Sequence, residues 1–305
     1  MVRLHLAVAS VAVAVLGSLP GAAGELAAQV PASEIEGREV IMITGSTDGI
    51  GAAVALQVAR EGAHVIVHGR SVARGDSIVA LVRAAGGTAR FYQADLGSLA
   101  QVRELANSII RDYPRLDVLV NNAGIGRGMP DAPREVSADG YELRFAVNYL
   151  SHYYLTLQLM PLLLESAPSR VVSTSSSAQG GGTIDFDNVM LEREPYRGAF
   201  AYSQSKLAQI FMTFDLNEEY AARGVTFNAV HPGGLLNTSM VRERGGEATM
   251  PPEEGAAFIV AAIKTSQTGQ YFNADQAARA ADQAYDLEAR RRLREMALRM
   301  MDEAL

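Results

Sequence analysis

The 305-residue chain contains no cysteine. This absence excludes disulfide bonds, zinc sites built on thiolates and catalysis by a thiol nucleophile. The chain also lacks an excess of positive charge, since 34 acidic and 27 basic side chains give a formal net charge of -7. No basic stripe of the kind that binds nucleic acid is present. We therefore expect no nucleic-acid partner, and we assign no metal site.

One long apolar run lies at the N-terminus. Arg3 precedes apolar residues from Leu4 to Leu19, and small residues follow at 20–24. This order is typical of a secretory signal peptide, and the run is short for a membrane span of roughly 20 residues. We expect residues 1–36 to be a signal or membrane-anchor segment with its linker. A start codon assigned too early is the alternative, and it would make the chain cytoplasmic instead of exported or membrane-associated.

From residue 37 onward, short apolar runs alternate with amphipathic stretches that predict helices. The apolar runs predict seven strands, at 40–43, 63–68, 89–93, 116–120, 170–174, 225–230 and 269–273. Alternation of strands and helices predicts parallel pairing with helical crossovers. We therefore expect residues 37–305 to form a single doubly wound Rossmann-type α/β domain. Its central parallel sheet would have about seven strands, with helices on both faces.

The first predicted strand runs directly into a glycine-rich turn with the spacing Gly-x-x-x-Gly-x-Gly, and a helix-forming stretch follows. In this context glycines allow the backbone to approach a pyrophosphate at the helix N-terminus. A glycine turn without a ligand is the alternative. If the turn binds a dinucleotide, we expect contacts from Gly45, Ser46, Thr47, Gly49, Ile50 and Gly51.

The second predicted strand ends at Gly69 and Arg70. In a dinucleotide fold this position lies beside the adenosine ribose, where a carboxylate binds the 2′-hydroxyl of NAD and an arginine accommodates the 2′-phosphate of NADP. Arg70 offers a guanidinium and the strand end has no carboxylate. We therefore predict NADP(H) as the preferred cofactor and NAD(H) as the second choice, unless Arg70 is only a solvated loop residue.

Tyr202 and Lys206 lie four residues apart in a predicted helix, and so share one of its faces. A nearby positive charge favours the phenolate and lowers the tyrosine pKa from its usual ~10. The pair is therefore suited to proton transfer. An ordinary amphipathic helix, with the tyrosine inward and the lysine outward, is the alternative.

Other polar residues follow strand ends, where ligands bind in open α/β sheets. These segments are Asn121-Asn122-Ala123-Gly124, Ser175-Ser176-Ser177 and His231-Pro232-Gly233. Turns of this composition are also common without a ligand. Asn148 lies within a long predicted helix at 139–166, where asparagine is unfavourable unless it is exposed or has a specific role.

Together these motifs resemble the short-chain dehydrogenase/reductase family. The resemblance rests on Thr44-Gly45-x-x-x-Gly49-Ile50-Gly51, Asp95, Asn121 to Gly124, Asn148, Ser175-Ser176, Tyr202-x-x-x-Lys206 and His231-Pro232-Gly233, in the family's order. The stretch 148–156, the long gap between Ser176 and Tyr202, and Thr268-Gly269-x-Tyr271-Phe272 are most similar to the retinol dehydrogenase-like branch. That branch often has a tryptophan near the C-terminus, and this chain has none.

The resemblance implies reversible oxidation of an alcohol to a carbonyl compound with NADP(H). Tyr202 matches the family's general acid/base, and Lys206 the residue that lowers its pKa and holds the nicotinamide ribose. Ser176 matches the residue that hydrogen-bonds the substrate oxygen, although Ser175 and Ser177 are close enough for a shift in register. Asn148 matches a helix-distorting residue that supports a water path to the lysine. Further cofactor contacts are implied for Asp95, Leu96, Asn122, Ala123, Gly124, Pro232 and Gly233.

Several alternatives stay open at this point. A threonine five residues after the proline often contacts the nicotinamide amide, but here that position is Asn237 and Thr238 follows it. Apolar residues in the loop 234–250 predict a lipophilic substrate unless they pack onto the domain; they are Leu235, Leu236, Met240, Val241 and Met250.

The helices that contain Asn148 and Lys206 form dimer interfaces in many relatives, so a homodimer is a further expectation. A non-catalytic redox sensor or scaffold on the same fold is the competing functional hypothesis. Another reaction, such as epimerisation or dehydration, is a third.

Overall fold

The computed structural model describes residues 29–193, 195–242 and 247–305. Residues 1–24, which carry the predicted signal or anchor, lie outside this described part. Among the described residues, no helix is long and apolar enough to cross a membrane. Residues 30–36, at the end of the predicted N-terminal segment, pack on the domain, because Val30 and Ile35 are buried and the Val30 N–H donates to the Asp112 carbonyl oxygen at 3.0 Å.

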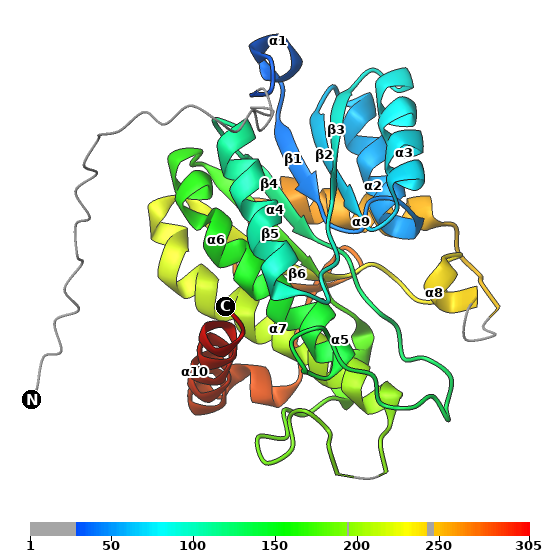
Figure 1. The fold of residues 1–305 in the computed structure, drawn as a ribbon, viewed down its shortest axis with the longest axis vertical. Helices are drawn as coiled ribbons and strands as arrows, with labels where there is room; N and C mark the ends of the chain where they lie inside the picture. Colours follow the sequence, from blue (N-terminus) through cyan, green and yellow to red (C-terminus); the bar gives the residue numbers. More distant parts are fainter. Residues whose placement is uncertain (1–28, 194, 243–246) are drawn as a thin grey trace, which may run out of the picture.

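An eight-stranded sheet forms the centre of the molecule (Figure 1), with the strand order β3-β2-β1-β4-β5-β6-β7-β8. The strands are β1 (Val40–Ile43), β2 (His64–Gly69), β3 (Thr88–Gln93), β4 (Val118–Asn121), β5 (Ser169–Thr174), β6 (Val225–His231), β7 (Gln270–Asn273) and β8 (Gln276–Ala278). Seven of them are parallel, which confirms the predicted fold class. The eighth, β8, pairs antiparallel with β7 and was not predicted, because its three residues form no apolar run.

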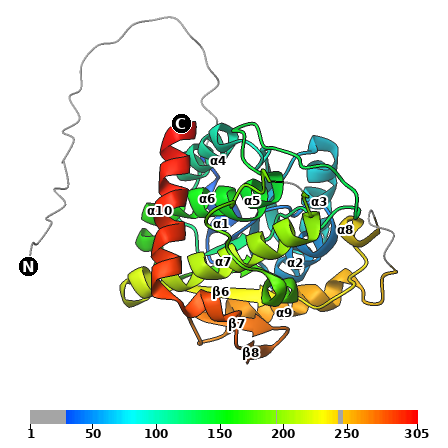
Figure 2. The same ribbon diagram turned by 90° about the horizontal axis from the view of Figure 1, so that it is seen from below.

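Helices cover both faces of the sheet (Figures 1 and 2). One face packs against α2 (Gly49–Arg60), α3 (Val72–Ala84) and α9 (Pro252–Lys264). The other face packs against α4 (Leu99–Asp112), α6 (Ser151–Glu165) and α7 (Gly198–Tyr220), with α10 (Leu287–Ala304) lying against α7 and α4. The shorter helices are α1 (Ala32–Ile35), α5 (Leu143–Phe145), α8 (Ser239–Arg242), the π-helix η1 (Ala146–Leu150) and the 3₁₀ helices η2 (Ser177–Gly181), η3 (Ala221–Arg223) and η4 (Asp282–Tyr285).

The chain direction across the sheet reverses at β1. From β1 the chain moves outward to β2 and β3, then crosses to β4 on the other side of β1 and continues to β8. Such a reversal opens a crevice beyond the carboxyl ends of the strands, where α/β folds bind ligands. The glycine turn after β1 and the Asn-Asn turn after β4 flank this point, so the fold brings together the motifs that the sequence separates.

Candidate active site

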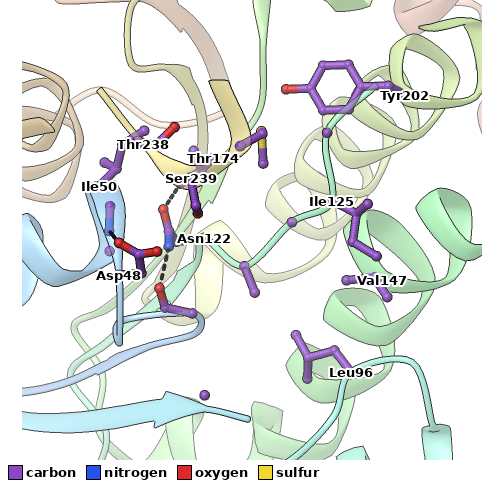
Figure 3. Close-up of a pocket in the computed structure, with 18 of the residues that line it drawn as sticks. Asp48, Ile50, Leu96, Asn122, Ile125, Val147, Thr174, Tyr202, Thr238 and Ser239 are labelled. Carbon is purple, nitrogen blue, oxygen red and sulfur yellow. Dashed lines mark hydrogen bonds between the residues drawn. The ribbon is translucent and has the colours of Figure 1, made fainter. Parts of the chain in front are cut away.

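A cavity of about 720 Å³ lies beyond the carboxyl ends of the strands (Figure 3). Tyr202 lies across it from Ile50 and Thr238. Nearly all predicted site residues line it: Gly45, Thr47, Gly49, Ile50, Gly51, Arg70, Asp95, Leu96, Asn122, Ala123, Gly124, Ser176, Tyr202, Lys206, Pro232 and Gly233. Ser46 and Asn148 do not line the cavity. Motifs up to about 190 residues apart in the sequence therefore share one concave site.

The glycine turn has a conformation and packing that glycine alone allows. Gly45 and Gly49 have φ values of +63° and +55°, in the left-handed region that disfavours residues with a Cβ. A Cβ at Gly45 would also lie 2.8 Å from the Ala123 Cα, and one at Gly51 would clash with the Gly45 carbonyl oxygen. The turn therefore lies directly against the loop after β4 and presents its backbone to the cavity.

Ser46 attaches this turn to the neighbouring strand. It is fully buried, and its N–H donates to the His68 carbonyl oxygen at 3.0 Å. Its hydroxyl accepts from the His68 N–H at 3.0 Å, and the Gly45 N–H donates to His68 Nδ1 at 3.1 Å. Ser46, behind the cavity wall, and His68, which lines the cavity, thus hold the shape of the turn.

Thr44 joins the ends of β1 and β4. Its hydroxyl oxygen accepts from the N–H groups of Asn122 and Ala123, at 2.9 and 3.0 Å. His152 Nε2 lies 3.0 Å from the same oxygen, and His152 Nδ1 lies 3.0 Å from the Asn148 carbonyl oxygen. Burial lowers the pKa of His152 to about 3, so the ring is neutral. Because a carbonyl only accepts, Nδ1 carries the proton and Nε2 accepts from the threonine hydroxyl.

Sequence reasoning missed His152. The available signal was its position one helical turn after Asn148, on the same face of the helix.

Lys206 is buried, contrary to the alternative in which it faces solvent. It is 3 % exposed, and Nζ donates to the Thr174 carbonyl oxygen at 2.7 Å and to Gln209 Oε1 at 2.9 Å. Nζ also lies 5.7 Å from the centroid of the half-buried Tyr202 ring. Burial lowers the lysine pKa to about 7. The two side chains that the helical spacing pairs therefore lie together at the cavity.

Asn148 is buried and lies within η1, where the chain makes π-helical turns. Its Nδ2 donates to the Ile125 carbonyl oxygen at 3.0 Å and to the Ser205 hydroxyl at 2.9 Å. Its Oδ1 accepts from the Ile125 N–H at 2.7 Å. The asparagine therefore ties the loop after β4 to α7, behind the cavity wall.

The three serines after β5 differ in their surroundings. Ser175 is buried and its hydroxyl donates to the Lys206 carbonyl oxygen at 2.9 Å. Ser176 is half-buried, and its hydroxyl oxygen accepts from the Ala178 N–H at 3.2 Å, while no acceptor for its proton is present in the part of the chain that the structure describes. Ser177 is exposed. All three line the cavity, but the Ser175 proton is already used within the protein.

The structure favours Thr238 over Asn237 as the cavity residue after the Pro-Gly turn. Thr238 lines the cavity, and its Cγ2 lies 3.1 Å from the position of a Cβ at Gly49. Asn237 Oδ1 instead accepts from an Arg242 Nη1 group at 2.7 Å. Thr238, one residue later than the expected position, therefore lines the cavity, and Asn237 does not.

Arg74 is a second guanidinium near Arg70 that sequence reasoning missed. Both side chains are exposed and line the cavity. Arg74 lies in the first turn of α3, and its Nη1 is 3.6 Å from Asp48 Oδ2. Its spacing of four residues from Arg70 was the available signal.

Comparison with known proteins agrees with this geometry. The family model described as short chain dehydrogenase matches residues 39–248. The chain belongs to the short-chain dehydrogenase/reductase family. Human retinol dehydrogenase 13 is 34 % identical over 282 residues, which cover 85 % of this chain and 83 % of that protein.

Solved structures share the same short-chain dehydrogenase/reductase fold. An uncharacterized protein from Mycobacterium paratuberculosis has a TM-score of 0.72 at 27 % identity, covering 87 % of this chain and 93 % of that one. A short chain dehydrogenase from Burkholderia cenocepacia, solved in complex with NADP, has a TM-score of 0.63 at 27 % identity, covering 79 % of this chain and 97 % of that one.

The site fits the nicotinamide dinucleotide that this family of dehydrogenases binds. Gly45, Gly49 and Gly51 line the cavity and add no side chain to it, as close approach to a pyrophosphate requires. Exposed guanidinium groups lie beyond it, after β2, and the Tyr202–Lys206 pair lies on α7. One cavity thus contains the glycine turn, the exposed guanidinium groups and the Tyr202–Lys206 pair.

The apolar residues of the loop after β6 divide into two groups. Leu235, Met240 and Val241 line the cavity. Leu236 also reaches it but is buried against Gly255 of α9, and Met250 packs near Gly233 outside the cavity lining. Both predicted alternatives, cavity lining and packing onto the domain, therefore apply to part of this set.

Proposed function

We propose that the protein interconverts an alcohol and an aldehyde or ketone, with NADP(H) as its preferred cofactor and NAD(H) as the second choice. One observation carries the proposal: Tyr202, Lys206 and Ser176 face the same cavity as the glycine turn. A binding protein without catalytic activity has no need of this set beside its dinucleotide site. Membership of an oxidoreductase family supports the same conclusion.

The bound cofactor supplies or accepts a hydride at the carbinol carbon. In reduction, the Tyr202 phenol gives its proton to the substrate oxygen, and in oxidation the phenolate takes it back. The Lys206 ammonium, with Nζ 5.7 Å from the ring centroid, favours the phenolate when the lysine is protonated. The Ser176 hydroxyl, whose proton no described side chain uses, donates to the substrate oxygen.

We assign Asn148 and His152 positioning roles. Asn148 holds Ile125 against α7, and His152 connects the Asn148 carbonyl oxygen to the Thr44 hydroxyl. Neither side chain lines the cavity. They fix the position of the loop after β4 relative to the helix that carries Lys206.

Arg70 and Arg74 support the preference for NADP(H). Both are exposed at the cavity after β2, where the 2′-phosphate of a bound NADP would lie, and Gly69 leaves no carboxylate at the strand end. A guanidinium binds phosphate oxygens in a bidentate manner. The Burkholderia relative solved with NADP supports the same choice.

A lipophilic substrate is supported by Leu235, Met240 and Val241 in the cavity wall. The name of the human relative, a retinol dehydrogenase, agrees with an apolar alcohol. Association with a membrane through residues 1–24 stays a prediction, and fractionation of cells that express the full chain tests it.

A homodimer also stays a prediction. Arg290 of α10 is buried against α7, where its guanidinium lies 2.6 Å from Asp215 Oδ1 and 2.9 Å from Glu218 Oε2. Copies that associate through α6 and α7 must therefore accommodate α10. Light scattering on the purified protein measures the outcome.

Fluorescence titration of the purified protein with NADPH and NADH tests the cofactor assignment. We expect tight NADPH binding, weaker NADH binding, and NADPH oxidation when carbonyl compounds are added. If NADH binds more tightly than NADPH, the proposed role of Arg70 and Arg74 is wrong, but the proposal that the protein is an oxidoreductase is unaffected. Binding of neither cofactor by a folded sample would favour the non-catalytic alternative.

A further inference from the structure

Arg127 brings a positive charge close to Tyr202. It lies in the loop after β4, is exposed, and lines the cavity. Its Cζ lies 5.9 Å from the centroid of the Tyr202 ring. No ion pair of Arg127 is present among the described residues. A guanidinium without a carboxylate partner therefore faces the place where the substrate would meet the proposed acid/base.

The loop that carries Arg127 is fixed from behind by a buried polar cluster. Arg144 is 2 % exposed, and its Nε donates to the Gly126 carbonyl oxygen at 2.7 Å. Its Nη1 donates to the Tyr196 hydroxyl at 2.8 Å and lies 3.6 Å from Glu142 Oε1. The Tyr196 hydroxyl donates to the same carboxylate oxygen at 2.9 Å. Glu142, which is fully buried, thus compensates the charge of Arg144.

The same loop packs directly on the start of α7. A Cβ at Gly198, the first residue of α7, would clash with the Arg127 carbonyl oxygen. Glycine at this position lets the two backbones touch. The Arg127 backbone is therefore held against the helix that carries Tyr202, so the nearness of the two side chains follows from the fold.

The other charges of the cavity have different surroundings. Asp48, Arg70, Arg74 and Asp95 lie on the side of the glycine turn and the ends of β2 and β3. Lys206 is buried among oxygen acceptors. Among the described residues that line the cavity, Arg127 thus brings an exposed charge against the Tyr202 ring. The loop residues Leu235, Met240 and Val241 add apolar surface to the same cavity.

We propose that the substrate is an amphipathic carbonyl compound or alcohol with a carboxylate, which pairs with Arg127 while its apolar part contacts the loop after β6. This inference rests on the proposed function. A guanidinium binds a carboxylate through two parallel hydrogen bonds. The carboxylate is unchanged in the reaction: the carbonyl carbon gains a hydride from NADPH, and its oxygen gains the proton of Tyr202.

Two aldehydes that differ in charge and by one methyl group test the inference. 4-Formylbenzoate and its methyl ester are reduced with NADPH by the full-length protein and by the variants Arg127→Met and Arg127→Lys. Arg197→Met is the matched control, because Arg197 is also exposed, immediately precedes α7 and does not line the cavity. We expect the wild-type protein to favour the acid in kcat/KM by about tenfold, as one charge-assisted contact allows.

Arg127→Met should lower kcat/KM for the acid about tenfold more than for the ester, and so abolish this preference. Arg127→Lys should retain part of it, and Arg197→Met should retain all of it. An equal loss for both aldehydes in Arg127→Met would overturn the inference, because Arg127 would then act on Tyr202 and not on a substrate carboxylate. The absence of a preference in the wild-type protein would also overturn it.

Failure of the proposed function is distinguishable from failure of the inference. If NADPH binds but neither aldehyde is reduced, the proposed function fails for these probes. Isothermal titration of the NADPH complex with the same two compounds then decides the inference. Tighter binding of the acid that disappears in Arg127→Met supports it, and equal binding of acid and ester overturns it.

Discussion

The side-chain amide of Asn148 binds both backbone polar groups of Ile125. Nδ2 donates to the Ile125 carbonyl oxygen at 3.0 Å, and Oδ1 accepts from the Ile125 N–H at 2.7 Å. Ile125 belongs to the loop after β4, and Asn148 belongs to a π-helical segment 23 residues later. An asparagine that is unfavourable for a regular helix thus positions one wall of the cavity.

Asn148→Ala should therefore reduce both stability and turnover. The substitution leaves the partly buried backbone groups of Ile125 without these partners, which costs about 1–3 kcal/mol in the free energy of unfolding. Asn228→Ala is the matched control, because Asn228 makes a similar pair of backbone contacts, to Gln267 and Gln270, away from the cavity. Urea unfolding should show comparable losses for the two variants, whereas kcat should fall strongly only in Asn148→Ala. Equal turnover in both would contradict a positioning role.

Replacement of Arg70 and Arg74 should weaken NADPH binding selectively. Each guanidinium is expected to contribute a charge-assisted contact to the 2′-phosphate, and loss of one such contact lowers affinity by about tenfold. NADH, which lacks this phosphate, should bind Arg70→Ala and Arg74→Ala nearly as it binds the wild-type protein. Arg103→Ala, on the exposed side of α4, is the control. If these substitutions lower the affinities for NADPH and NADH equally, the two arginines do not bind the 2′-phosphate.

Lys206 should make stability increase with pH on the alkaline side. Its pKa is about 7 in the folded protein, because burial disfavours the charged form, against an ordinary value of ~10.4 in the unfolded chain. Between these values the unfolded chain binds a proton that the folded chain does not. The free energy of unfolding therefore rises as pH increases from about 7 toward ~10.4.

Lys206→Met should remove this part of the rise. The chain has one other lysine, the exposed Lys264, and Lys264→Met is the control that should keep the wild-type slope. Unfolding in urea at pH 7 and pH 9 measures the difference. Identical slopes in the wild-type protein and Lys206→Met would show that the lysine is not desolvated.

Buried histidines should destabilise the protein in acid. Burial lowers the pKa of His64 and His68 to about 4 and that of His152 to about 3, from an ordinary value of ~6.5. Below pH 6.5 the unfolded chain binds protons that the folded chain does not, so stability falls as pH decreases toward 4. His64→Gln, which lies away from the cavity, should lose less stability between pH 7 and pH 5 than the wild-type protein. If His64→Gln loses as much stability between pH 7 and pH 5 as the wild-type protein, then His64 does not contribute to the acid destabilisation.

The sequence predicts the sheet well because buried parallel strands are continuous apolar runs. All seven predicted strands are present, with ends that differ by at most two residues. The exposed edge strand β8 has no such signal. The helix predicted at 139–166 begins only at Leu143 and contains η1. The π-helical segment was not predicted, because the hydrophobic pattern of a sequence does not distinguish a π-helical turn from an α-helical one.

The site likewise contains features that the sequence predicts and features that it does not. Motifs with fixed local spacing, such as Tyr202 and Lys206, are recognisable in the sequence. Contacts between distant segments are not, and the pairing of His152 with Thr44 spans 108 residues. For Ser46 the motif and the structure differ. Its place within the glycine turn predicts a cofactor contact, but its side chain faces β2 and not the cavity.

Turnover of Tyr202→Phe tests the central claim most directly. The substitution removes the phenol proton proposed to move to the substrate oxygen, and Tyr220→Phe at the far end of α7 is the control. We expect carbonyl reduction to fall by about 10²–10⁴-fold in Tyr202→Phe, with NADPH affinity nearly intact and the control nearly unchanged. Near-normal turnover in Tyr202→Phe would contradict the assignment of Tyr202 as the general acid/base.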